Sequence, residues 1–342
     1  CALLTYGGVV VFVVSFAMYP LGLRLLKEAD IPKRLFCGAL ALGAGTFTLT
    51  ALPGTPSIHN IIPTLALGTN LFSAPLLGIF GGLVMFILGL IYLEYERNKA
   101  VRNGEGFEPG TNDIIPHIDE ISNIVPPWPL ACLPLLLVIL LIMTPRVLDG
   151  LGADWEIISF ANKEPVIWPS FALLVGSIFS LAVFPTIRFE ALKILGGGTQ
   201  DAIMPLMATS AVIGFGGVVA QTTGFAFFTQ TILSLDLHPM VSMFVSASTV
   251  SGITGSSSGG LQIFMSTLAE DYLNLGISPD ELHRLAAMAS GGLDSLPHCG
   301  AVIAMLTITQ LTHKEAYKDV GVVTVIVPII ATIATIFLAV IF

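Results

Sequence analysis

Apolar residues in this chain come in runs long enough to cross a lipid bilayer. A helix needs about 20 apolar residues to span the ~30 Å hydrocarbon layer. Four such runs are nearly free of charged residues within their apolar stretch, and they occupy residues 73–95, 130–148, 166–185 and 320–342. We therefore predict that each of these four runs forms a transmembrane helix.

Other apolar segments contain clusters of Gly, Ser, Thr or Pro at what would be membrane depth. Irregular backbone at that depth is tolerated only beside a cavity or buried in protein. Pro53 and Pro297 lack an amide donor, so they are expected to break their helices near mid-membrane. The run Gly255–Gly260 has the composition of a re-entrant hairpin tip. The interrupted segments are 5–26, 33–70, 200–228, 239–272 and 281–312.

Composition places the chain among polytopic membrane proteins. Of its 342 residues 54% are hydrophobic and 11% are charged, against about 25% charged in soluble domains, and its mean hydropathy is +0.87. A formal net charge of -9 leaves no basic surface for phosphates, which excludes a nucleic-acid binder. The four cysteines, Cys1, Cys37, Cys132 and Cys299, stand alone and predict small apolar packing residues rather than metal ligands. No cofactor is expected. Because the chain opens on Cys1 within an apolar segment, we expect it to lack its natural N-terminus.

The positive charges give the predicted spans a consistent orientation. All but three of the 14 Lys and Arg fall on one side, which the positive-inside rule makes cytoplasmic. The exceptions are Arg146, Lys163 and Arg284. Residues 99–127 form the one long polar stretch and predict a cytoplasmic linker between two halves, 1–98 and 128–342.

The two halves contain similar segments with oppositely charged corners. Residues 31–56 and 277–300 each run from an Ile and a Pro, through a small-residue helix, to a Pro-containing break. The first corner is basic, with Arg24, Lys27, Lys33 and Arg34, whereas the second is mainly acidic, with Glu270, Asp271, Asp280 and Glu281. Equivalent corners on opposite sides of the membrane indicate an inverted repeat, which is typical of transporters.

Two hairpin tips and two broken helices that meet at mid-membrane would form a binding site for a small carboxylate. The hydroxyls of Ser256, Ser257 and Ser258 can hydrogen-bond a polar guest, and the following helix directs its positive N-terminus toward an anion. Asp294 is costly at membrane depth and is therefore a functional candidate, although a satisfied structural carboxylate is the alternative. His298 would share its helix face only if Pro297 did not interrupt the helix.

These motifs resemble the gluconate permease (GntP) family of bacterial proton-coupled carboxylate symporters, within the wider ion-transporter superfamily. The resemblance rests on residues 50–69, the glycine-rich run 196–217, the tip 255–260 and residues 277–298. It implies an all-α elevator-type transporter with inverted repeats, two re-entrant hairpins and two broken helices. It further implies a homodimer in the bacterial inner membrane that takes up gluconate or a related hydroxycarboxylate with protons.

The resemblance also implies which residues contact the substrate and which one carries the coupling proton. The family's His-Gly and Pro-Pro-His stretches are replaced here by Thr50-Ala51 and by Leu52 to Pro56, so 3-hydroxybutyrate, another organic anion and sodium coupling stay open as alternatives. A membrane-embedded enzyme is the rival class, but no GxSxG or HExxH motif accompanies the serines and histidines. A passive channel is a further alternative. The proton site is Asp294, and the implied substrate contacts are Thr5, Gly7, Gly8, Thr50, Pro53, Gly54, Thr55, Ser256, Ser257, Ser258, Ser295 and His298.

Overall fold

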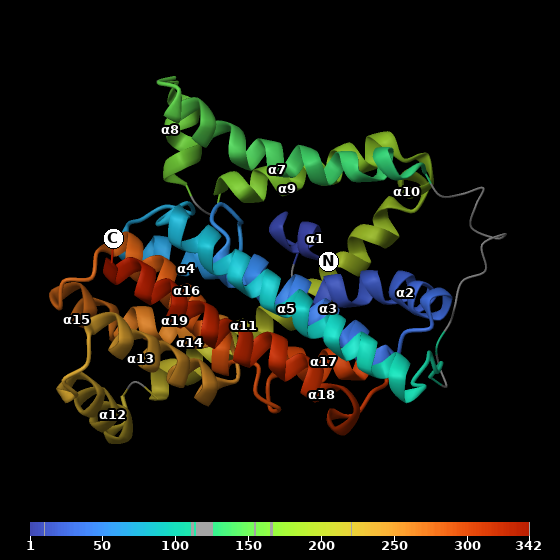
Figure 1. Cartoon of the computed structure of the whole chain (residues 1–342). Helices are drawn as coiled ribbons and strands as arrows, with labels where there is room; N and C mark the ends of the chain where they lie inside the picture. Colours follow the sequence, from blue (N-terminus) through green and yellow to red (C-terminus); the bar gives the residue numbers. More distant parts are fainter. Residues whose placement is uncertain are drawn as a thin grey trace.

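The computed structural model describes residues 1–9, 11–110, 113, 126–153, 155–164, 167–219 and 221–341. Every regular element within these ranges is helical, and the described residues contain no strand (Figure 1). This confirms the expected all-α class. The predicted linker 99–127 lies partly outside the described residues, which include 99–110, 113 and 126–127 of it.

The elements fall into two series along the chain. The first series is α1 (Ala2–Tyr6), α2 (Val11–Ala29), α3 (Lys33–Gly45), η1 (Phe47–Ala51), α4 (Ile58–Leu67) and α5 (Pro75–Asn103). The second begins with α7 (Trp128–Gly150), α8 (Glu156–Lys163), α9 (Ile167–Val183), α10 (Pro185–Phe189), α11 (Ala191–Val219) and α12 (Thr223–Ser234). It ends with α13 (Pro239–Thr254), α14 (Ser257–Thr267), α15 (Ala269–Asn274), α16 (Pro279–Leu293), α17 (Gly300–Thr309), α18 (His313–Gly321), η2 (Val322–Ile326) and α19 (Val327–Ile341).

Several helices are long and apolar enough to cross a membrane. Among the described residues there are four of them, or five if the bent pair α8 and α9 counts as one span. The predicted run 73–95 is α5, which continues to Asn103, and the run 320–342 begins earlier, at His313. The chain is therefore a membrane protein.

Both predicted helix breaks are present. The first separates η1 from α4 at residues 52–57, where Pro53 cannot continue a helix and Gly54 has a φ of 82°. The second separates α16 from α17 at residues 294–299 and contains Pro297. Each interruption leaves backbone groups without their helical partners, and those groups need other partners within the protein.

The short helix after each break, α4 or α17, packs among helices of the other series. Ile62 of α4, from the first series, belongs to the apolar cluster built by α13, α14 and α16. Val302, Met305 and Leu306 of α17, from the second series, belong to the cluster built by α2, α3 and α18. The long helices α5 and α19 pack against each other across the body. The second half of each broken helix therefore packs against helices of the other series.

Helices α7, α8 and α9 form a separate layer above this body in the view of Figure 1. Their main packing contacts are with one another. One contact between the layer and the body involves the Tyr6 hydroxyl of α1. It lies 3.1 Å from the Pro53 carbonyl of the body and 3.9 Å from Met143 Sδ of α7.

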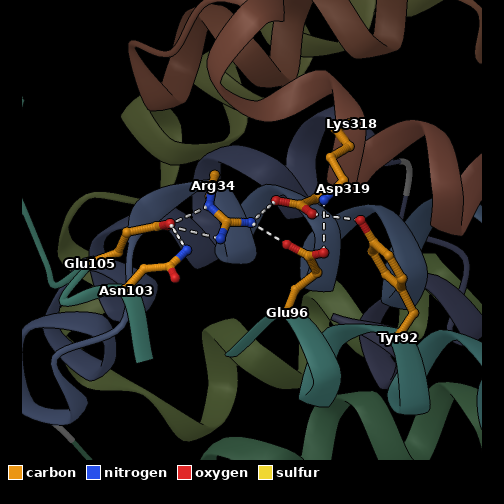
Figure 2. Close-up of polar contacts among 7 residues, drawn as sticks. All are labelled: Arg34, Tyr92, Glu96, Asn103, Glu105, Lys318 and Asp319. Atoms are coloured by element: carbon orange, nitrogen blue, oxygen red, sulfur yellow. Dashed lines mark hydrogen bonds and ion pairs between the residues drawn. The ribbon is translucent and has the colours of Figure 1, made fainter. Parts of the chain in front are cut away.

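A charged cluster fixes the start of α3 to α5 and α18 (Figure 2). Arg34 lies 2.6 Å from Asp319, 3.1 Å from Glu96 and 2.9 Å from Glu105. Lys318 Nζ lies 2.7 Å from the Glu96 carboxylate, and the Tyr92 hydroxyl donates a hydrogen bond to the Asp319 carboxylate. We call these six residues the Arg34 cluster. The hydrogen bond from Arg34, with a second from Asn103, lowers the pKa of the Glu105 carboxyl below its usual value.

A second ion pair attaches the described part of the linker to the body. Asp113 lies 2.7 Å from Lys33, and neither side chain is exposed by more than 5%. Burial alone would raise the pKa of Asp113, but hydrogen bonds from Lys33 and Tyr19 outweigh it and lower that pKa. Both charged groups belong to the side that the sequence predicts to be cytoplasmic.

Candidate functional site

A cavity of about 290 Å³ lies between the two interrupted helices. Its walls come from α3, η1 and the start of α4 in the first series, and from the tip before α14, the break 294–299, α17, α18 and η2 in the second. Both π-helical segments contribute a side chain, Leu49 from η1 and Thr324 from η2. Such segments concentrate at functional sites because the extra residue in the turn re-aims the side chains.

The predicted hairpin tip forms one wall of the cavity. Ser256 caps α14, because its Oγ accepts the Gly259 N–H at 3.2 Å and lies 3.4 Å from the Ser258 hydroxyl. Gly255 has a φ of 60°, and a Cβ there would lie 2.7 Å from the His298 ring. Only glycine therefore lets the tip turn this close to the second break.

Asp294 connects the tip to the second break. Its side chain is 7% exposed, and its carboxylate accepts the Ser295 hydroxyl at 3.1 Å. Ser257, the first residue of α14, borders the same cavity. The Asp294 carboxylate therefore has the Ser295 hydroxyl as a donor and also borders the cavity.

His298 and the carbonyls of the second break have partners within the protein. His298 Nε2 donates to the Gly252 carbonyl at 3.0 Å, which joins the break to α13. Tyr317 donates to the Ser295 carbonyl at 3.1 Å, and His313 Nε2 donates to the Pro297 carbonyl at 2.8 Å. Cys299, a buried free thiol, lies on the cavity wall. The break is thus held in a fixed shape around the cavity.

The structure brings together the predicted residues of the second half and leaves those of the first half outside the cavity lining. Ser256, Ser257, Ser258, Asp294, Ser295 and His298 all border the cavity. Thr5, Gly7, Gly8, Thr50, Pro53, Gly54 and Thr55 do not. Their contribution to substrate contact stays a prediction.

The first-half candidates support the first break instead. A Cβ on Gly8 would lie 2.9 Å from Pro56, and a Cβ on Gly7 would lie 2.4 Å from Leu135 of α7. Thr5 and Thr50 are buried, and each donates its hydroxyl to a carbonyl four residues earlier. The Gly54 N–H donates to the Leu71 carbonyl at 2.9 Å.

Helices α4, α14 and α17 border the cavity with their first turns. In the described structure the capping residues of α4 and α17, Ser57 and Cys299, make no side-chain cap. Ser57 instead donates its hydroxyl to the Leu49 carbonyl at 2.9 Å. Uncapped N-termini carry partial positive charge and free N–H groups, so this cavity is chemically suited to an anion. No group of three or more potential metal-binding side chains occurs among the described residues.

Arg284 is a buried polar residue whose role the charge pattern of the sequence did not predict. In that pattern Arg284 is an exception to the cytoplasmic placement of the basic residues, and in the structure its side chain, on α16, is completely buried. The guanidinium donates to the Ala51 carbonyl at 3.1 Å, to the Ser73 carbonyl at 3.0 Å and to Asn60 Oδ1 at 2.8 Å. It therefore satisfies carbonyls that the first break leaves open. Its position two turns into an amphipathic, small-residue helix was the signal in the sequence.

The chain is similar to a transporter of Bacillus subtilis (strain 168) described as the uncharacterized transporter YxjC. The two are 38% identical over 349 residues, which cover 95% of this chain and 74% of the relative. No family model matches the chain. No solved structure matches it either.

Proposed function

We propose that this chain, which belongs to the same transporter family as YxjC, is a secondary active carrier of a small hydroxycarboxylate in symport with protons. The observation that carries the proposal is the cavity between the two interrupted helices. Its volume, about 290 Å³, is at the lower end of the roughly 300–1,000 Å³ of ligand pockets. That size and the helix N-termini on the cavity wall favour a small organic anion. The bacterial inner membrane and a homodimer are part of the proposal.

The inverted repeat is proposed from the packing of the half-helices. Helix α4 packs with α14 and α16, while α17 packs with α2 and α3, which is the reciprocity expected of two halves related by a pseudo-two-fold axis. The separate layer of α7, α8 and α9 supports an elevator-type motion of the remaining body against it. The resemblance to the gluconate permease family adds to this support.

In the proposed mechanism the substrate carboxylate binds at the helix N-termini and Asp294 carries the coupling proton. Moving an ionised carboxylate through a low-dielectric layer is costly, by about 2.5–3.5 kcal/mol on insertion scales. Protonation of Asp294 removes that charge when the substrate is present, so the loaded site moves more easily than the half-loaded one.

The test is uptake of labelled gluconate and 3-hydroxybutyrate into proteoliposomes under an imposed pH gradient, with sodium varied separately. We expect accumulation that follows the pH gradient and not the sodium gradient. Asp294→Asn is expected to exchange labelled for unlabelled substrate but to lose accumulation driven by the pH gradient. Asp280→Asn, on the exposed first turn of α16, the helix that ends just before Asp294, is the matched control and should behave as wild type.

The possible results separate the parts of the proposal. Accumulation that follows sodium alone would remove the proton scheme and keep the carrier. Unchanged proton-driven uptake in Asp294→Asn would clear Asp294 of the coupling role. Absence of uptake and of counterflow for every hydroxycarboxylate tested would contradict the proposed substrate class.

A further inference from the structure

His59 is a buried polar side chain with no protein partner. It lies in the first turn of α4, borders the cavity and is 2% exposed. Neither Nδ1 nor Nε2 has a hydrogen-bond partner in the described part of the chain. Buried polar atoms are nearly always paired, so an orphaned ring on a cavity wall needs an explanation.

The position of His59 is fixed although its ring is unpaired. Its neighbour Asn60 donates to the Thr55 carbonyl at 2.9 Å and accepts from Arg284 at 2.8 Å. Consecutive residues of a helix point about 100° apart, so the contacts that hold Asn60 leave His59 directed elsewhere. The first turn of α4 is thus anchored, and the imidazole is presented to the cavity without a competing bond.

The chemistry of a neutral imidazole suits a hydroxyl group. One ring nitrogen donates and the other accepts, whereas a hydroxyl can do both and a carboxylate can only accept. A hydroxyl therefore pairs with whichever nitrogen faces the cavity, in either tautomer. The carboxylate of the same molecule has a separate place at the uncapped N-terminus of α17 and the tip before α14.

We propose that His59 binds the hydroxyl of the transported hydroxycarboxylate and so sets the preference for hydroxy acids over acids without the hydroxyl. This inference rests on the proposed function, because it names the residue that recognises the substrate hydroxyl at the same site. His59 was not among the substrate contacts expected from the sequence.

The test uses pairs of acids that differ by one hydroxyl: 3-hydroxybutyrate with butyrate, and lactate with propionate. Each competes against a labelled hydroxy acid in proteoliposomes, and the selectivity is the ratio of the two half-inhibitory concentrations. We expect wild type to favour the hydroxy acid and His59→Leu to lower that ratio about tenfold, the worth of one hydrogen bond. His59→Gln keeps a donor and an acceptor and should retain most of the preference. Ile58→Val, on the neighbouring cavity residue, is expected to change both affinities equally and leave the ratio unchanged.

The outcomes distinguish this inference from the proposed function. A wild type that carries hydroxy acids with no preference, or a His59→Leu variant with the wild-type ratio, overturns the role of His59 and leaves the carrier intact. An equal loss of preference in His59→Gln and His59→Leu also overturns it, because hydrogen bonding would then not be the cause. If His59→Leu does not fold, His59→Met serves as the apolar variant. A wild type that carries no hydroxy acid refutes the proposed function itself.

Discussion

Replacing Arg284 by Met should destabilise the body of the protein by removing the partner of the first break. The guanidinium reaches five acceptors, the carbonyls of Ala51, Leu52, Leu71 and Ser73 and the side chain of Asn60. All of them are uncharged oxygens. Met keeps the length and apolar stem of the side chain but has no donor.

The magnitude follows from the three contacts of 3.1 Å or less, to Asn60 Oδ1, the Ser73 carbonyl and the Ala51 carbonyl. Each buried acceptor left without a partner costs about 1–3 kcal/mol, or roughly 3–9 kcal/mol for three. Against this, Met relieves the cost of burying a guanidinium whose five acceptors are all uncharged, which is several kcal/mol. We expect a net loss of about 3 kcal/mol, equivalent to a fall of about 6 °C in Tm at ~2 °C per kcal/mol.

The assay is thermal unfolding in detergent, followed with a maleimide dye that fluoresces on reaction with thiols. Cys37 and Cys299 are buried in the body and react when it unfolds. Arg97→Met is the matched control, because Arg97 is 49% exposed and pairs with Glu94 on the same helix, so its loss should change the stability by less than about 0.5 kcal/mol.

Lysine at position 284 gives a second point on the same scale. The lysine ammonium is a compact charge, and it cannot reach as many of these acceptors at once as the planar guanidinium does. The Tm of Arg284→Lys should therefore lie between those of wild type and Arg284→Met. A Tm for Arg284→Met within 1 °C of that for Arg97→Met, roughly the scatter of surface substitutions, would refute the assignment of Arg284 to the first break.

Two further predictions use the same assay. Gly260→Ala would place a Cβ 2.2 Å from Ser251 Oγ and 2.3 Å from Ser251 Cα, so α13 and α14 must separate. Tm should then fall by about 4 °C, as for an overpacking cost of ~2 kcal/mol. Gly196→Ala, whose Cβ would meet nothing within 4 Å, should not lower Tm, and equal Tm values for the two variants would contradict the close packing of α13 and α14. The pKa of Glu105 is lowered in the folded protein by its hydrogen bond from Arg34, so its stabilising contribution is complete above the ordinary pKa of about 4.3 and is lost as the pH falls through the lower native value. The Tm of Glu105→Gln should therefore lie below that of wild type at neutral pH, and the difference between the two should shrink as the pH falls below about 4.3. A Tm difference that is constant with pH would count against the Arg34–Glu105 contact.

Several parts of the fold could be predicted from the sequence because one local property decides them. The length of an apolar run fixes whether a helix spans the bilayer, and a proline without a donor fixes where a helix breaks. The tip at residues 255–260 was predicted because its glycines and serines are suited to a turn that exposes backbone amides. These features depend on neighbours in the chain, and the structure has the two breaks and the tip at the predicted positions.

The cavity wall of the first half could not be predicted in the same way. The π-helical turn η1, Phe47–Ala51, contains an extra residue per turn and so rotates the side chains around it relative to a regular helix. Within η1, Leu49 borders the cavity whereas Thr50 does not. His59 borders it from α4, beyond the break that contains Thr55. The role of Arg284 depends on carbonyls more than 200 residues away in the chain, and charge patterning alone does not contain that information.

In the proposed mechanism the substrate occupies the cavity between the two interrupted helices. In a chain whose four native cysteines are replaced by Ala, Ala301→Cys places a single thiol on the cavity wall at a half-buried position, and its reaction with a small methanethiosulfonate reagent can be followed in proteoliposomes. Leu275→Cys, 50% exposed and outside the cavity, is the control. We expect a transported hydroxy acid to slow modification of the cavity thiol with the same concentration dependence as its uptake, and to leave the control thiol unaffected. Full reactivity of the cavity thiol at saturating substrate, with transport intact, would contradict the claim.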